Sequence, residues 1–141
     1  MKRLLAAYIL VYATNTKAEI NRADFKCLAQ AIHQEARGEP LSGKYAVGQV
    51  IINRTKLPYY PSTICAVIYQ PGQFQWTKKN KNVLPDIASY KIARNVILGT
   101  HPYTKFSGTH FHATYVRPGW KHKKIALIGK HIFYREKSNQ T

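Results

Sequence analysis

Apolar residues recur every three to four positions in three separate segments between residues 25 and 99, which is the spacing of one helix face. The first segment lies between Asp24, which can cap a helix, and Gly38, which can end one. The second begins near Ser42, and the third extends from Pro85 to Gly99. The pattern predicts three helices packed through their apolar faces. The positions expected to face inward are Phe25, Leu28, Ala29, Ile32 and Ala36 in the first helix, Ala46, Val47, Val50, Ile51 and Arg54 in the second, and Ile87, Ala88, Ile92, Ala93, Val96 and Ile97 in the third.

Prolines and glycines divide the chain between the second and third of these helices. A short helix is expected from Ser62 or Thr63 to Tyr69. Residues 73–76 and 78–81 show no helical or strand period and are expected to form loops.

The period changes toward two after Lys105, which is typical of strands. Phe111, Ala113 and Tyr115 alternate with polar residues, and a second apolar run extends over residues 125–134. The predicted fold class is therefore α+β, mainly α, with a small β element in the C-terminal part of the chain.

The N-terminus has the pattern of a secretory signal peptide, a basic start followed by the apolar residues 4–13. The apolar run is too short to span a bilayer, although an uncleaved anchor is the alternative. Small residues permit cleavage after Ala18 or Ala13, of which Ala18 is favoured. The predicted organisation is a signal peptide at 1–18 and one domain at 19–141, exported to the periplasm or cell envelope.

The chain is strongly basic, with 22 Lys and Arg against 6 Asp and Glu and a formal net charge of +16. Loss of residues 1–18 would remove three of the cations. Because self-repulsion of this size destabilises a compact domain, the charge favours an anionic partner. Nucleic acid, anionic lipid and an anionic cell-wall polymer all meet that description.

Two cysteines, Cys27 and Cys65, lie in the part that would remain after export. An even count in an exported chain is compatible with one disulfide, which would close a loop of ~40 residues and join the first helix to the short one. The alternative is that both are small buried hydrophobic residues.

Glu35 is the polar residue that departs most from the helical pattern. It lies three and four residues from Ile32 and Ala31 and seven from Leu28, so it shares their apolar face and should be at least half buried. Burial raises the pKa of a carboxyl, and so does the negative end of a helix that stops at Gly38. Glu35 is therefore a candidate general acid. The alternative is a structural ion pair with Arg37 or a lysine.

The small number of acidic residues favours the catalytic interpretation. Asp24 and Asp86 can cap helices, and Glu19 and Glu136 lie near the chain ends. Glu35 and Glu39 are the two that remain without an obvious structural role.

The stretch 73–76, Gln-Phe-Gln-Trp, alternates amide and aromatic side chains. Such a stretch can line a sugar-binding groove, because rings stack on sugar faces while amides reach the hydroxyl and N-acetyl groups. The alternative is that the aromatic rings belong to the core.

The histidines allow a weaker interpretation as metal ligands. His110 and His112 are spaced as a pair, with His33 and His131 elsewhere. The sequence lacks HExxH, lacks the Pro-Cys-x-x-Cys that accompanies HxE in zinc deaminases, and lacks paired cysteines. No metal or cofactor is predicted.

Several motifs follow one another along the chain. They are residues 28–43 (LAQAIHQEARGEPLSG), 46–54 (AVGQVIINR), 60–65 (YPSTIC), 73–76 (QFQW), Phe111-His112-Ala113, Val116-x-Pro118-x-Trp120 and Gly129-x-His131-x-Phe133-Tyr134. In this order they resemble the cell wall hydrolase family of the spore cortex-lytic enzyme SleB type. The commoner family form has Ser at the position of Gln75.

The resemblance implies a lysozyme-like, mainly helical domain that cleaves peptidoglycan glycan strands between N-acetylmuramic acid and N-acetylglucosamine, as a lytic transglycosylase. It implies that Glu35 is the catalytic acid. An ordinary glycosidase needs two carboxyl groups. A transglycosylase can use one, because the substrate's own C6 hydroxyl attacks the anomeric carbon. Glu35 would first protonate the leaving oxygen and then take the proton of the attacking hydroxyl. Glu39 is either a helper or a residue that bonds loop amides around Gly38 to Gly43.

The candidate substrate-binding residues are Glu39, Gln73, Phe74, Trp76, His112 and Tyr115. The expected partner is peptidoglycan, and the protein is expected to act as a monomer without nucleic acid or a stable membrane span. Two alternatives from other classes are a basic nucleic-acid-binding module and a zinc-dependent wall amidase.

Overall fold

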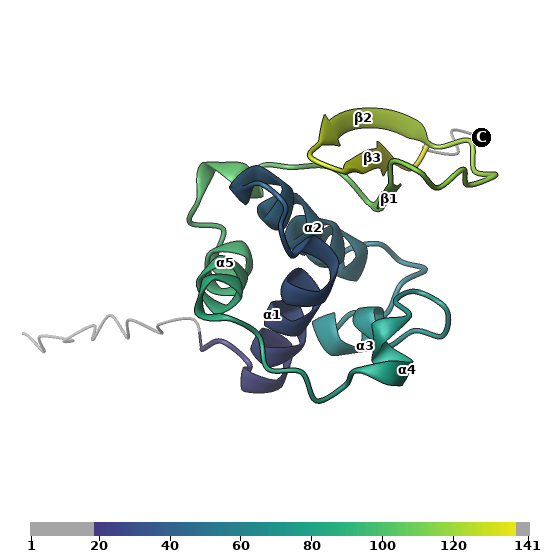
Figure 1. The fold of residues 1–141 in the computed structure, drawn as a ribbon. Coiled ribbons are helices and arrows are strands. Elements are labelled where there is room, and N and C mark those ends of the chain that lie inside the picture. Colours follow the sequence, from purple (N-terminus) through teal and green to yellow (C-terminus); the bar gives the residue numbers. More distant parts are fainter. Residues whose placement is uncertain (1–18, 138–141) are drawn as a thin grey trace, which may run out of the picture.

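The computed structural model of the protein describes residues 19–137 (Figure 1). The predicted signal peptide, residues 1–18, lies outside them. The elements are α1 (Arg22–Ala36), α2 (Leu41–Thr55), α3 (Ile64–Ile68), α4 (Trp76–Lys79), α5 (Ile87–Leu98), a 3-10 turn (Pro102–Thr104), β1 (His110–Ala113), β2 (Lys123–Ile128) and β3 (His131–Arg135). Among the described residues, no helix is long and apolar enough to cross a membrane.

Helix α1 starts earlier than the sequence predicts. Asn21 is its N-cap, and the Asn21 side chain accepts a hydrogen bond from the Asp24 amide. The prediction that Asp24 caps α1 is wrong. The Asp24 carboxylate instead accepts a hydrogen bond of 3.0 Å from the Cys65 amide, in the first turn of α3. This acid therefore joins two helices that are far apart in sequence.

Helices α1, α2 and α5 pack around one hydrophobic core (Figure 1). Gly48 permits close packing of α2, because a Cβ there would lie 3.1 Å from Ile32 in α1 and 3.3 Å from Val96 in α5. Arg54 is buried on the inner face of α2, as the helical pattern predicts.

Two details of the predicted helices are wrong. Ile87 and Ala88 are exposed, because they lie in the first turn of α5, directly after its Asp86 N-cap, where Ser89 turns inward instead. The stretch from residue 73 to 81 is not all loop, since Trp76 begins the short helix α4.

The three strands form an antiparallel sheet in the order β1-β3-β2. Gly129, with φ of 55°, makes the tight turn between β2 and β3. Phe133 of β3 is fully buried and packs with Ala46, Val47 and Val50 of α2. The sheet is thereby fixed against the helical layer (Figure 1). The predicted fold class, mainly α with a small C-terminal β element, is confirmed.

A disulfide joins Cys27 of α1 to Cys65 of α3 across a sequence separation of 38, with their Cα atoms 5.4 Å apart. Together with the Asp24 hydrogen bond it holds α3 against α1.

Replacing both cysteines with alanine should lower the free energy of unfolding by about 4 kcal/mol, the loop-closure value for a ring of this size. Urea unfolding of wild type and C27A/C65A would measure it. Reduction of the wild type should produce the same loss and should have no effect on the double variant. Equal stability of the oxidised wild type and the variant would contradict the prediction.

Candidate active site

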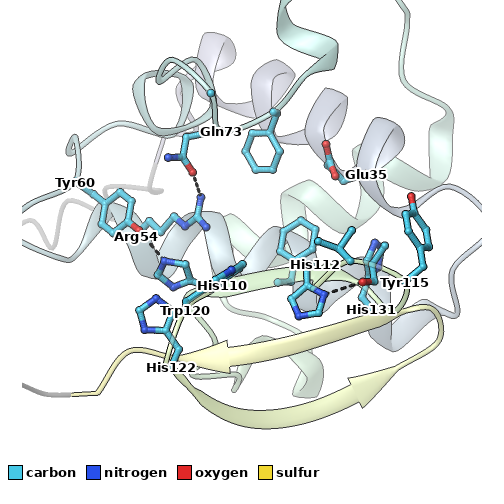
Figure 2. A pocket seen from close by; sticks show the side chains of 15 residues that line it. Glu35, Arg54, Tyr60, Gln73, His110, His112, Tyr115, Trp120, His122 and His131 are labelled. Atoms are coloured by element: carbon cyan, nitrogen blue, oxygen red, sulfur yellow. Dashed lines mark hydrogen bonds between the residues drawn. The ribbon is translucent and has the colours of Figure 1, made fainter. Parts of the chain in front are cut away.

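A cleft of about 690 Å³ lies between the helical layer and the sheet (Figure 2). Helix α1 contributes Glu35 and α2 contributes Arg54, while the sheet and its connections form the opposite wall. The lining residues are Glu35, Arg54, Tyr60, Gly72, Gln73, Phe74, His110, Phe111, His112, Ala113, Tyr115, Val116, Trp120, His122 and His131.

Glu35 is in the last turn of α1, next to the fully buried Ala36. Loss of hydration on burial raises the pKa of Glu35 from 4.5 to about 7, while the Trp76 indole acts in the opposite direction. The Trp76 Nε1 atom is buried and has no hydrogen-bond partner of good geometry in residues 19–137, so its stabilisation of the carboxylate is weak. A large fraction of Glu35 therefore carries a proton at neutral pH.

Glu35 forms no ion pair within residues 19–137, where each of the three such pairs contains a histidine. Arg37 contacts the His33 ring at 3.3 Å instead. The structural ion-pair alternative therefore finds no partner in the described chain. Glu35 is also the single carboxyl among the residues that line the cleft.

Arg54 organises the end of the cleft away from Glu35 (Figure 2). It is 5% exposed and donates from Nε to the Thr109 carbonyl at 2.8 Å and from Nη1 to the Gln73 side chain at 3.0 Å. Its guanidinium lies 5.3 Å from the centre of the Tyr60 ring. One buried cation thus links α2, the 73–76 stretch and the start of β1.

His110 is neutral at pH 7. Burial, the Arg54 charge and His122 lower the pKa of His110 to about 4. Its 3.6 Å contact with Glu136 is therefore not a charged pair at that pH. Its ring nitrogens lie 3.0 Å from the Thr109 hydroxyl and 3.3 Å from the Tyr60 hydroxyl, so both are occupied.

Both nitrogens of His112 are also occupied. Nδ1 lies 2.7 Å from the Ala113 carbonyl, which can only accept, so Nδ1 carries the hydrogen. Nε2 lies 2.7 Å from the Tyr134 hydroxyl, which donates to it when the ring is neutral. His112 is thus a fixed part of the cleft wall, with its ring stacked on Tyr134.

Of the sequence-predicted site residues, Glu35, Gln73, Phe74, His112 and Tyr115 line the cleft. Glu39 and Trp76 do not. The Glu39 carboxylate accepts a hydrogen bond from the Lys130 amide at 3.0 Å. The amide that it bonds therefore lies in the hairpin between β2 and β3, and not in residues 38–43 as the structural alternative expected. Phe74 and Trp76 are 6% and 7% exposed, which supports the alternative that their rings belong to the core.

Sequence reasoning did not select Arg54, Tyr60, His110, Trp120, His122 or His131 as site residues. Arg54 could have been found from its position, because it is a cation on the otherwise apolar inner face of α2. His110 and His131 were considered only as metal ligands. Within residues 19–137 no group of three or more His, Cys, Asp or Glu side chains is placed to hold a metal ion.

Known proteins are similar to this chain in sequence and in fold. The model of the Cell Wall Hydrolase family matches residues 38–134. The spore cortex-lytic enzyme of Halalkalibacterium halodurans is 33% identical over 124 residues, which are 86% of this chain and 37% of that protein. The spore cortex-lytic enzyme of Bacillus subtilis is 32% identical over 123 residues, 86% of this chain and 40% of that protein. The chain thus spans about two fifths of these curated relatives.

Two solved structures have the same fold. The catalytic domain of the germination-specific lytic transglycosylase SleB from Bacillus anthracis has a TM-score of 0.74 and 27% identity, and the match covers 84% of this chain and 98% of that one. The catalytic domain of the Bacillus cereus SleB protein has a TM-score of 0.73 and 27% identity, covering 89% and 99%.

The raised pKa of Glu35 predicts a pH-dependent difference in stability between wild type and E35Q. The folded state holds the Glu35 proton more tightly than the unfolded chain, so this contribution is complete below pH 4.5 and is lost as pH rises through about 7. E35Q, which is always neutral, lacks this loss. In urea unfolding, the free energy of unfolding of E35Q relative to wild type should therefore rise with pH. It should gain nothing at pH 4.5 and about 3 kcal/mol at pH 8. A difference that does not change with pH would contradict the shift.

Substitution of Tyr115 should affect ligand binding, whereas substitution of Trp76 should affect stability. Tyr115 is 87% exposed and lines the cleft, whereas Trp76 is buried outside it. Y115A should weaken binding of glycan fragments by about 1–2 kcal/mol and change unfolding by less than about 0.5 kcal/mol. W76A should lower the free energy of unfolding by about 3–5 kcal/mol. Calorimetric titration and urea unfolding of both variants would test this, and a fully stable W76A would refute the core assignment.

Proposed function

The chain belongs to the cell wall hydrolase family, and we propose on this premise that it cleaves peptidoglycan glycan strands between N-acetylmuramic acid and N-acetylglucosamine. Glu35 acts as the general acid that protonates the leaving glycosidic oxygen. The observation that carries this proposal is a single carboxyl in the cleft whose pKa burial raises to about 7. A general acid works best when its pKa is near the working pH.

The proposed reaction type is that of a lytic transglycosylase. Glycoside hydrolysis ordinarily uses two carboxyl groups across the scissile bond. The described chain contains all six acidic residues, and only Glu35 lines the cleft. A nucleophile from the substrate removes the need for a carboxylate that activates water. The C6 hydroxyl of the muramoyl residue attacks C1 of the same sugar, and the product has a 1,6-anhydro end.

The cleft supplies several polar groups for sugar recognition besides Glu35. Gln73 is held by Arg54, and the His112 ring is fixed by two hydrogen bonds, so both enter the cleft in set orientations. Tyr115 offers an exposed ring for stacking against a sugar face. Fixed polar groups with an exposed ring suit a neutral, hydroxyl-rich glycan.

The charge of the domain supports attachment to an anionic wall. No Lys or Arg side chain in residues 19–137 pairs with a carboxylate, since the ion pairs there all contain histidine. All of these cations except the buried Arg54 are available to the carboxylates and phosphates of a wall polymer. The protein would reach that polymer by export, with residues 1–18 as its signal peptide, and would act there as a monomer.

E35Q should abolish glycan cleavage while the protein remains folded, because the amide keeps the side-chain shape and has no acidic proton. Incubation with purified peptidoglycan followed by mass spectrometry of the products measures both loss and chemistry. Wild type should release fragments with 1,6-anhydromuramoyl ends. Reducing muramoyl ends would indicate a hydrolase, and free peptides an amidase. Activity of E35Q within a few-fold of wild type would refute the role of Glu35.

A further inference from the structure

His131 differs from the other histidines of the cleft in two ways. Its Nε2 makes no hydrogen bond in the described chain, and its Nδ1 faces a carboxylate. His110 and His112 have both nitrogens engaged. His122 lies against His110 and Trp120, at the end of the cleft away from Glu35 (Figure 2). His131 is 8% exposed and lines the cleft.

The buried side of His131 faces Glu39. Nδ1 of His131 has no hydrogen-bond partner in the described chain and lies 3.8 Å from the Glu39 Oε1 atom. The other Glu39 oxygen accepts the Lys130 amide, which fixes the carboxylate in place. Gly129 makes room for it, because a Cβ there would overlap that oxygen. The Glu39 side chain is 8% exposed, so water does not compete strongly for it.

The other side of His131 opens to the cleft. Nε2 makes no hydrogen bond within residues 19–137 and, unlike Nδ1, is not fully buried. Because His131 lines the cleft, we take Nε2 as the ring atom that faces it. The edges of Phe111 and Phe133 hold the ring, with centroids at 5.2 and 6.1 Å. His131 comes from the sheet and Glu35 from the helical wall, toward the same end of the cleft (Figure 2).

A carboxylate that faces Nδ1 of an imidazole favours the tautomer with the hydrogen on Nδ1 and leaves Nε2 as a base. The distance of 3.8 Å is longer than a hydrogen bond, and such contacts commonly shorten when substrate binds. Burial and the nearby His112 lower the pKa of His131, while Glu39 raises it, and the net shift is downward. The neutral, basic form of His131 therefore predominates at pH 7.

We propose that His131, in place of Glu35, is the proton acceptor of the reaction and that Glu39 is its positioning residue. This inference rests on the proposed function. In the step, the bond between C1 and the leaving oxygen breaks and the Glu35 proton moves to that oxygen. A bond forms between C1 and the substrate's C6 oxygen, and the hydroxyl proton moves to Nε2 of His131. Proton return from His131 to Glu35 through water completes the cycle, with no oxidant or reductant required.

Two separate proton-transfer groups, Glu35 as acid and His131 as acceptor, predict how activity depends on pH. Activity requires Glu35 protonated and His131 neutral, so kcat should fall at high pH through Glu35 and at low pH through His131. The fall at low pH, called the low-pH limb below, follows the pKa of His131. The charged or titratable groups that shift this pKa are Glu39, from the α1–α2 connection, and His112, from β1.

The test compares kcat, KM and pH profiles of wild type, H131Q and E39Q on soluble glycan strands. H131Q should lose about 10²- to 10⁴-fold in kcat with KM changed only a few-fold, and its low-pH limb should disappear. E39Q should lose less, and its low-pH limb should move to lower pH, because the lost charge had raised the pKa of His131. H101Q is the matched control: His101 stacks on Tyr45 outside the cleft, so kcat and both limbs should be unchanged.

An H131Q enzyme within three-fold of wild type, with an unchanged pH profile, would overturn the inference. If H131Q does not fold, E39Q decides, since an unmoved low-pH limb overturns the inference and a shift to lower pH supports it. E35Q separates the two proposals. An inactive E35Q beside an active H131Q rejects only the role of His131, whereas an active E35Q rejects the proposed function itself.

Discussion

The chemistry of the cleft depends on keeping the Glu35 carboxyl out of water. Ordinarily such a group is ionised at neutral pH, and burial alone raises its pKa to about 7. The chain can maintain this because the carboxyl is in the last turn of a helix that is fixed on several sides. Helices α2 and α5 pack against α1, and the disulfide and the Asp24 hydrogen bond fix α3 to it. A loosely held α1 would admit water and lower the pKa.

The opposite wall of the cleft is fixed by a different device. Phe133 anchors the small sheet in the apolar face of α2, and the buried Arg54 reaches from α2 to the Thr109 carbonyl and the Gln73 amide. Breaking such a buried hydrogen-bonded cation away from its partners is costly, so the wall should move little when a ligand binds. Rigidity of both walls suits the proposed reaction, in which the acid, the sugar and the attacking hydroxyl must be aligned.

Charge is distributed differently in the cleft and on the surface of the described chain. Inside the cleft, burial suppresses the charge of His110 and His131 and retains the proton of Glu35, so that Arg54 is the one permanently charged side chain in its lining. On the surface, the exposed Lys and Arg residues of the described chain form no ion pairs with carboxylates. Low dielectric sets the first property and sequence composition sets the second.

Local patterns in the sequence were sufficient for the helices, for the position of Glu35 and for the mainly α fold class. Helical spacing directly determines which side chains share a face, and Gly38 and Gly99 have the left-handed φ values that end helices. Spacing could not reveal that Asn21, not Asp24, caps α1, because either residue can cap and only the contact with Cys65 separates them.

Contacts between distant segments decided the rest. Glu39 and His131 lie 92 positions apart and meet only because the β2–β3 hairpin folds onto the α1–α2 connection. The alternation of amide and aromatic side chains at residues 73–76 predicted sugar stacking by Phe74 and Trp76, but both rings are buried in the hydrophobic core. Sequence by itself determined which groups are available and on which helix face they lie. Tertiary structure decided which of them face the cleft, because burial and pairing depend on neighbours that no local period encodes.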